Sequence, residues 1–263
     1  MTAGDLPILE TVGLTKHFGG LAAVVDLSLC VGRKEIFGLI GPNGAGKSTI
    51  LNLIAGSLRP KSGRVVFNGE DVTDLAAHSR AGRGIARVFQ ANTVFPDVSV
   101  ATNVRVGFHL HTGIGFWETF FGRKSATEGR EKLLYEKTME ILRLVGLYEE
   151  RDLAATSLPH ASQRRLCLAI ALAAGPSLLL LDEPVTGMTA EEVTTMLSVI
   201  RALRDEKGIG CVLVEHNMRA VMNVCDRIAV VNYGEKIAEG SAAEISEDPA
   251  VIEAYLGAEG DAV

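Results

Sequence analysis

The sequence predicts an α/β fold, in which a buried parallel sheet is accompanied by an antiparallel β-subdomain and an inserted helical subdomain. Uninterrupted apolar runs at 36–40, 178–181 and 211–214 predict strands buried on both faces, as in a parallel sheet. The dipeptide Asn68-Gly69 between two short strand-like segments predicts an antiparallel hairpin. From residue 91 to residue 155, aromatic and helical patterns replace the strands. The chain has 263 residues, of which 47% are hydrophobic, so it can bury a large core.

The composition narrows the possible partners and compartments. A net charge of −6 and a pI near 5.6 argue against general nucleic-acid binding. Residues 1–10 lack a basic region followed by an apolar stretch, which argues against a signal peptide. The longest apolar stretch, 166–181, is interrupted by Gly175-Pro176 and predicts a buried helix followed by a buried strand, too short to span a bilayer. The mean hydropathy of +0.22 indicates a large core or a surface that partners cover.

The cysteines are scattered and form no CxxC pair. All lie in apolar surroundings, which predicts reduced, buried thiols in the cytosol. They are Cys30, Cys167, Cys211 and Cys225.

The first segment, 8–31, alternates in the manner of strands around a break at Phe18-Gly19-Gly20. Phe18 has two interpretations. It belongs to the core, as a lone phenylalanine usually does, or it offers a surface on which a nucleobase stacks. Its position alone favours the core.

A glycine-rich turn follows the apolar run at 36–40, and a helix begins at Lys47. The turn fits the pattern G-x-x-x-x-G-K-[ST], in which backbone N–H groups converge on phosphate oxygens because glycines keep side chains out of the way. The helix N-terminus adds positive charge, Lys47 reaches the outer phosphates, and the Ser48 hydroxyl is a ligand for Mg²⁺. This context predicts a nucleoside-triphosphate site rather than a tight connection. Its residues are Gly41, Pro42, Asn43, Gly44, Ala45, Gly46, Lys47, Ser48 and Thr49.

Two β segments come next. Residues 64–67 and 70–72 flank Asn68-Gly69 as the arms of the hairpin. Residues 84–90 predict a strand that ends at Gln90, which by itself is an ordinary strand-end glutamine.

The section from 91 to 155 predicts a mainly helical insertion. Residues 128–145 have one apolar face and stop at Gly146. The aromatic cluster before them is core or a docking face for another chain rather than a lipid anchor, because few basic residues lie nearby. His109 and His111 lack further ligands at suitable spacing, so no metal site is expected there. The cluster comprises Phe108, Phe116, Trp117, Phe120 and Phe121.

The buried run at 178–181 ends in Asp182-Glu183. This acidic pair therefore projects from the carboxyl edge of a parallel sheet, where ligands of such sheets bind. An aspartate there holds Mg²⁺ directly or through water, and an adjacent glutamate orients and deprotonates a water molecule. Together with the upstream phosphate loop, this function is favoured over a solvated acidic turn.

The C-terminal third continues the α/β pattern. Thr189-x-x-Glu192 predicts a capping box that begins a helix ending at Gly208. Residues 211–214 predict a buried strand that ends at Glu215-His216, where a histidine is usually polar surface. A β pair joined by a turn at Tyr233-Gly234 follows, and then a helix and a loose acidic tail.

With these motifs placed, the chain resembles the ATP-binding cassette of ABC transporters along nearly its whole length. The elements stand in the family's order: GPNGAGKST at 41–49, Gln90, the region 158–166, LLLLDE at 178–183, and His216. The resemblance implies a P-loop NTPase with a RecA-like core that binds ATP and Mg²⁺ and hydrolyses ATP.

The resemblance also implies roles for single residues. Gln90 coordinates Mg²⁺ and the attacking water and couples to the membrane partner. Glu183 is the general base, His216 senses the γ-phosphate, and Phe18 stacks on adenine. Asp182 and Ser48 keep the metal-binding roles that their chemistry suggests.

The implied organisation is a single nucleotide-binding domain over 1–263. Residues 8–90 and 166–240 form the core with its antiparallel β-subdomain, 91–165 the helical subdomain, and 241–263 the C-terminal helix and tail. The implied partners are a second cassette, related or identical, and two membrane permease subunits at the cytoplasmic face of the inner membrane. A periplasmic solute-binding protein takes part indirectly, and nucleic acid does not.

Finer features resemble the cassette of the branched-chain amino acid importer. They are FGGLAAV near the start, GIARVFQ, the aromatic insertion, VLVEHNM, and the ending DPAVIEAYLG. This subfamily implies uptake of branched-chain amino acids or related small polar solutes. The lipopolysaccharide-export cassette is a close relative and stays an alternative.

One motif departs from the family. Its LSGGQ falls on Leu158-Pro159-His160-Ala161-Ser162, so the family's serine and both glycines are missing. In the family this stretch donates hydrogen bonds to ATP on the opposite cassette, and Pro159 has neither an N–H nor a hydroxyl. Losing one well-aimed donor costs about 10²–10³-fold in rate. If Ala161 needs a positive φ, roughly 1–2 kcal/mol of strain is added. Thr189 likewise replaces the usual Asp or Asn and serves as a cap.

Two rival functions follow. A soluble ATP-driven switch of the same superfamily would carry two cassettes, a coiled coil or a basic face, and none of these is visible. A regulatory or weakly active cassette paired with an active partner agrees with Pro159 and Ala161, whereas Glu183 and His216 argue against it.

Overall fold

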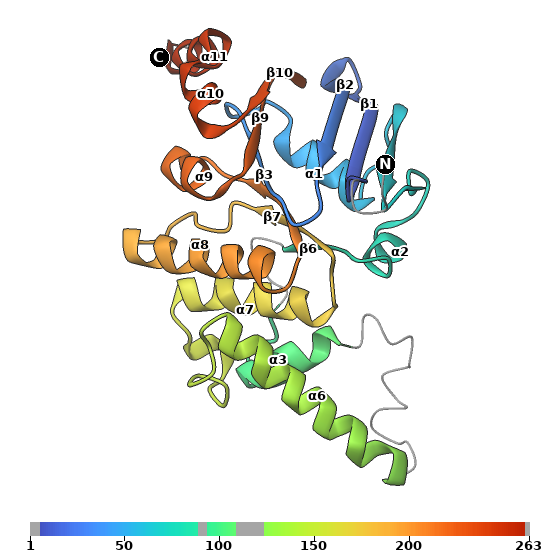
Figure 1. The fold of residues 1–263 in the computed structure, drawn as a ribbon, viewed down its shortest axis with the longest axis vertical. Coiled ribbons are helices and arrows are strands. Elements are labelled where there is room, and N and C mark those ends of the chain that lie inside the picture. The colour runs from blue at the N-terminus through green and yellow to red at the C-terminus, as the bar shows by residue number, and fades with distance from the viewer. Residues whose placement is uncertain (1–5, 89–93, 109–123, 261–263) are drawn as a thin grey trace.

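The computed structural model describes residues 6–88, 94–108 and 124–260. Within these ranges the chain forms a six-stranded sheet, a four-stranded sheet and a set of helices around them. In Figure 1, α3, α6 and α7 lie in the lower half of the molecule, and α10 and α11 lie at the upper end, beside β10.

The six-stranded sheet has the order β10-β9-β3-β8-β7-β6 and is parallel except for β10 at its edge. The predicted buried runs are its central strands, and each has apolar side chains on both faces. The register places Asp182 beside Val214, so the ends of β7 and β8 meet at one edge. The strands are β3 (Ile36–Ile40), β6 (Ile85–Val88), β7 (Leu178–Asp182), β8 (Gly210–Val214), β9 (Arg227–Asn232) and β10 (Glu235–Gly240).

The four-stranded sheet is antiparallel, with the order β2-β1-β4-β5. Asn68 and Gly69 have φ values of 51° and 81°, as a two-residue hairpin turn requires, and this confirms the predicted hairpin. The prediction of buried cysteines is wrong for Cys30, which is exposed because side chains alternate along β2 and it points away from buried Leu29 and Val31. Cys225 is only half-buried. The strands are β1 (Leu9–Phe18), β2 (Leu21–Val31), β4 (Ser62–Phe67) and β5 (Glu70–Asp71).

The helices largely follow the sequence patterns, including the capping box of Thr189 and Glu192 at α8. The C-terminal segment differs from the prediction, since it forms two helices rather than one. Pro249 has no N–H to continue α10, so a second helix begins there. The helices are α1 (Lys47–Ala55), α2 (Ala77–Ala81), α3 (Val100–Gly107), α6 (Lys124–Leu144), α7 (His160–Ala173), α8 (Ala190–Asp205), α9 (Met218–Val224), α10 (Ala242–Glu247) and α11 (Pro249–Gly260), with a short 3₁₀ turn at Ala155–Ser157.

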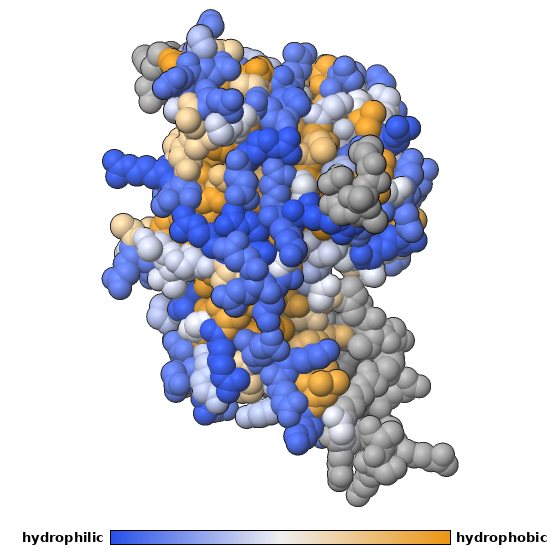
Figure 2. All heavy atoms as spheres, viewed as in Figure 1, coloured by the Kyte–Doolittle hydropathy of each residue, from blue (hydrophilic) through white to orange (hydrophobic). Residues whose placement is uncertain are grey.

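The core lies on both faces of the six-stranded sheet. Leu179 and Leu181 pack with α3, α6, α7 and α8 on one face. Leu178 and Leu180 pack with α1 and the four-stranded sheet on the other. A smaller cluster joins β9 to α9, α10 and α11. The face in Figure 2 is mostly hydrophilic, with hydrophobic residues visible between the polar ones.

Candidate functional site

The turn between β3 and α1 has a backbone that glycine alone can follow at its tightest point. Gly46 has a φ of 101°, and a Cβ there would lie 2.4 Å from the carbonyl oxygen of Ala23. Gly44 has a φ of 81° with open space around it. Gly46 also serves as the N-cap of α1 and has no side chain with which to cap. The N–H groups of the first helical turn are therefore directed toward the loop, as an anion site requires.

Lys47, the first residue of α1, is only 6% exposed. Its Nζ donates hydrogen bonds to the carbonyl oxygens of Gly41 at 2.7 Å and Pro42 at 2.8 Å. Burial lowers the pKa of Lys47, and the carboxylates of Glu183 and Asp182 oppose this shift. The ammonium group thus lies inside the loop, within the field of the acidic pair. Ser48 follows it in the first helical turn and is exposed.

Asp182, at the end of β7, forms an ion pair that the sequence analysis did not anticipate. Its Oδ2 accepts a hydrogen bond of 2.8 Å from Arg87 on β6. The same guanidinium donates to Oδ1 of Asn52 on α1 at 2.5 Å. Arg87 therefore joins β6, β7 and the helix of the phosphate loop. No short motif indicated this contact, because the three residues are far apart in the sequence.

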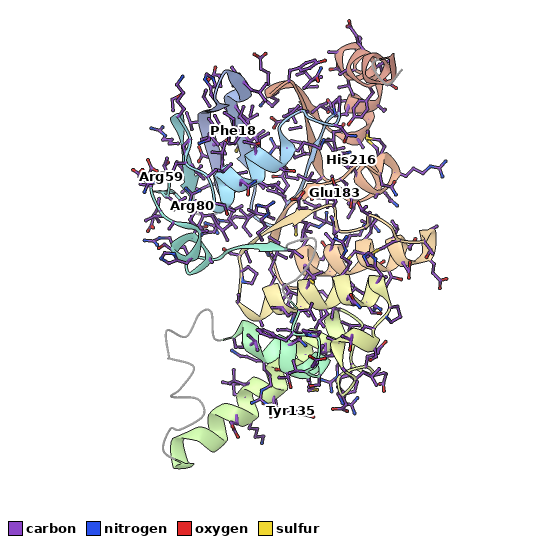
Figure 3. All side chains as sticks on the ribbon, turned by 180° about the vertical axis from the view of Figure 1, so that it is seen from behind. Phe18, Arg59, Arg80, Tyr135, Glu183 and His216 are labelled. Atoms are coloured by element: carbon purple, nitrogen blue, oxygen red, sulfur yellow. The ribbon has the colours of Figure 1, made fainter. Side chains whose placement is uncertain are left out.

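Glu183 and His216 meet where β7 and β8 end. His216 Nε2 and Glu183 Oε1 are 2.7 Å apart and form a hydrogen bond. The backbone supports this contact, since the N–H of Glu183 donates to the carbonyl oxygen of Val214 at 2.8 Å. Glu183 has a positive φ of 50°, which is unusual for a residue with a side chain. Figure 3 shows the two residues close together in the middle of the molecule.

The remaining predicted site residues lie apart from this pair or outside the described residues. Phe18, at the end of β1, is 46% exposed, and the Lys16 ammonium lies 5.5 Å from its ring centroid. Figure 3 shows Phe18 at the antiparallel sheet, to which β1 belongs. Outside the described residues lie Gln90, His109, His111, Phe116, Trp117, Phe120 and Phe121.

The donor set around the loop fits a hard cation. Mg²⁺ prefers oxygen ligands and usually takes few from the protein, relying on phosphates and water for the rest. The Ser48 hydroxyl and the Asp182 carboxylate are oxygens of this kind. Asp182 would hold Mg²⁺ together with Ser48, while Arg87 binds its Oδ2. Among the described residues no group of three or more His, Cys, Asp or Glu side chains could hold a metal alone.

The stretch 158–162 has a different geometry from a glycine turn. Pro159 is the N-cap of α7, and Ala161 lies within the helix rather than among the residues with positive φ, so the conditional strain does not arise. Ser162 is buried, and its Oγ accepts a hydrogen bond of 3.0 Å from Arg165. That hydroxyl is therefore engaged within its own chain.

None of the helices in the described residues is long and apolar enough to cross a membrane.

Comparison with known proteins supports the resemblance. The model of the ABC transporter family matches residues 24–186, and a model for branched-chain amino acid ATP-binding cassette transporters matches residues 235–261. The high-affinity branched-chain amino acid transport ATP-binding protein BraF of Pseudomonas aeruginosa is 37% identical over 251 residues, which cover 95% of this chain and 98% of BraF. The lipopolysaccharide export system ATP-binding protein LptB of Haemophilus influenzae is 33% identical over 252 residues, with coverages of 96% and 98%.

Among solved structures, the ADP conformation of MJ1267, an ATP-binding cassette of an ABC transporter, superposes with a TM-score of 0.83. It is 30% identical in sequence, and the match covers 96% of this chain and 99% of that one. The chain thus has the mixed α/β fold of a P-loop NTPase cassette. The chain belongs to the ABC transporter family, as one of its ATP-binding cassettes.

Proposed function

We propose that this chain binds ATP with Mg²⁺ at residues 41–49 and hydrolyses it to drive an ABC transporter. The observation that carries the proposal is the hydrogen bond between Glu183 and His216 at the edge of the sheet. At the same edge, the carboxylates of Glu183 and Asp182 raise the pKa of buried Lys47 against the effect of its burial. Phosphoryl transfer depends on positioned charge more than on covalent chemistry, and this edge supplies positioned charge of both signs.

Each residue has a stated part in this proposal. The backbone of 41–47 and the Lys47 ammonium bind the phosphates, and Phe18 stacks on the adenine. Glu183 accepts a proton from the attacking water, while His216 orients Glu183 and contacts the γ-phosphate. Ser48, Gln90 and Asp182 hold Mg²⁺, which when bound neutralises charge on the phosphates.

The transported solute is inferred from relatives. BraF is named for high-affinity transport of branched-chain amino acids, and the matching model at 235–261 carries the same description. We therefore assign uptake of branched-chain amino acids or related small polar solutes. Lipopolysaccharide export is the weaker assignment, since LptB shares less identity, at 33% against 37%.

The working unit in this proposal is a pair of cassettes docked under two permease subunits at the cytoplasmic face of the inner membrane. A periplasmic solute-binding protein delivers the solute. Within the chain, 8–90 and 166–240 serve as the nucleotide-binding core with its β-subdomain, 91–165 as the helical subdomain, and 241–263 as the C-terminal region.

The pair of sites is proposed to be unequal. Pro159 has no N–H and the Ser162 hydroxyl is buried, so 158–162 lacks two of the donors that the family resemblance implies for ATP on the partner cassette. This supports a partner that is related but not identical, whose own nucleotide site is the weaker one.

A binding measurement with the full-length chain tests the proposal. We expect Mg-ATP to bind at micromolar to millimolar concentrations in calorimetry, and Lys47→Ala to abolish this binding. Lys132→Ala, which removes an exposed ammonium on α6, is the matched control and should bind as the parent does. Absence of ATP binding by the parent at millimolar concentration, or unchanged binding by the Lys47 variant, would refute the assignment.

A further inference from the structure

Glu215, the residue after β8, is a buried carboxylate that the proposed reaction does not use. It is 2% exposed. Its Oε1 accepts a hydrogen bond of 2.8 Å from the backbone N–H of Val185, and its Oε2 accepts one of 3.2 Å from the N–H of His216. The N–H of Asn217 also interacts with it. Burial raises the pKa of Glu215, and these N–H groups act in the opposite direction.

The backbone groups that it holds belong to two separate segments. Val185 lies two residues after Glu183, in the loop that joins β7 to α8. His216 and Asn217 lie in the connection from β8 to α9. Glu215 therefore ties together the two backbone segments that carry the Glu183 and His216 side chains, whose own contact is 2.7 Å.

The backbone at Glu183 needs contacts that hold its conformation. It is left-handed, with a φ of 50°, and a residue with a side chain keeps that conformation only when its surroundings enforce it. One enforcing contact is the bond from the Glu183 N–H to Val214, and the bond from Val185 to Glu215 is the next one along the loop.

We propose that Glu215 is a positioning residue, whose buried carboxylate fixes the loop after Glu183 against the backbone of His216 and so sets the geometry of the Glu183–His216 pair. This inference rests on the proposed ATP hydrolysis. Packing alone does not account for the residue, because an apolar side chain would fill the space without the cost of burying a carboxylate. Glu183 adds to that cost, since its charge disfavours ionisation of Glu215.

Two substitutions separate the parts of this role. Glu215→Ala removes both acceptor oxygens. Glu215→Gln keeps the size of the side chain and one acceptor oxygen, enough for the Val185 N–H. Glu235→Ala, at an exposed position on β10, is the control for loss of a carboxylate.

The kinetics are measured on the full-length chain, alone and with the subunits that copurify with it. For Glu215→Ala we expect kcat to fall about 10- to 100-fold, since misplacement of a catalytic group by about an ångström has effects of this size. The Kd for Mg-ATP should stay within about twofold, because the phosphate loop is untouched. Glu215→Gln should recover part of the lost kcat.

A double-mutant comparison tests whether Glu215 acts through Glu183. In a Glu183→Gln background, Glu215→Ala should lower the residual rate little further, because residues that act as a unit are not additive. Multiplying losses would overturn the proposal. A kcat for Glu215→Ala equal to that of the control would also overturn it. A fall in ATP-binding stoichiometry that matches the fall in rate would do the same, because the lost rate would then reflect lost binding sites.

The two proposals fail in different ways. If the parent protein neither binds nor hydrolyses ATP, the proposed function is wrong. If the parent hydrolyses ATP and both Glu215 variants match it, only the positioning role is wrong. Should Glu215→Ala fail to fold, Glu215→Gln alone and combined with Glu183→Gln gives the same comparison.

Discussion

Arg80 is 1% exposed, and its guanidinium donates hydrogen bonds to four backbone carbonyl oxygens. Those of Leu53 and Ile54 belong to the last turn of α1, which otherwise has no basic residue. Burial lowers the pKa of Arg80, and Asp71 and Asp74 oppose that shift. The side chain thus closes the C-terminal end of the helix that begins at the phosphate loop.

Replacing Arg80 by methionine should lower the free energy of unfolding by roughly 3 kcal/mol, because buried carbonyl oxygens lose their donors. Urea denaturation measures the change. Arg59→Met removes an exposed guanidinium and should change stability by less than about 0.5 kcal/mol. Equal stability of the two variants would contradict the role given to Arg80.

Within the phosphate loop, two glycines should respond differently to alanine. Gly46→Ala places a Cβ 2.4 Å from a backbone oxygen, so the loop must move, and we expect ATP binding to be lost. Gly44→Ala meets no atom within 4 Å and adds only left-handed strain, about 1–2 kcal/mol. Calorimetric titration with Mg-ATP compares the two variants. Weaker ATP binding by Gly44→Ala than by Gly46→Ala would refute the prediction.

The cysteines should differ in reactivity. Burial raises the pKa of Cys211 and Cys225 to about 12, so both are almost entirely thiols at pH 8. Cys167 is buried, and Cys30 is exposed. Mass spectrometry after brief maleimide treatment of the native protein should therefore find one label, on Cys30, and none in Cys30→Ser. Early labelling of Cys211 would show that β8 is less protected than its burial implies.

At the scale of elements, α8 depends on its first turn. The Thr189 hydroxyl accepts from the Glu192 N–H, and the Glu192 carboxylate accepts from the Thr189 N–H. Thr189→Ala should cost about 1 kcal/mol of stability in urea denaturation. Thr194→Ala, within the same helix, removes a hydroxyl bonded only to the carbonyl of Ala190 one turn earlier and should cost less.

Elements with local causes could be predicted from the sequence. Asn68-Gly69, the Thr189 box and the glycine loop act through neighbours a few residues away, and the structure agrees with each. The exposure of Cys30 follows from the alternation of buried and exposed side chains along β2. The prediction for the cysteines did not take this alternation into account. The division into two C-terminal helices also had signals, because Ser241 and Glu244 form a capping box at the start of α10 and Pro249 begins α11.

Contacts between distant segments could not be predicted. Arg87 binds a carboxylate 95 residues away, and Glu215 binds a backbone N–H 30 residues away. Nothing local distinguishes these side chains from ordinary strand-end residues. Only the strand order of the sheet, which brings β6, β7 and β8 together, gives them their partners.

At the scale of the whole molecule, the sequence contains one phosphate loop, and the proposed working unit has a second cassette. We expect unequal sites. In the reconstituted complex, Glu183→Gln in this chain should remove most ATP hydrolysis, because the site that uses Lys47 and Glu183 is the competent one. The equivalent change in the partner cassette should have a small effect. Equal losses in a phosphate-release assay would count against the inequality.

The contacts of Lys47 affect which of the many small anions in a cell can bind to the phosphate loop. Because Gly41 and Pro42 accept hydrogen bonds from two of the three N–H groups of the Lys47 ammonium, an anion that binds this group competes with two carbonyl oxygens. We expect chloride or a single inorganic phosphate to compete poorly. A polyphosphate chain also reaches the amides farther along the turn, so we expect the loop to favour a triphosphate over simple salts.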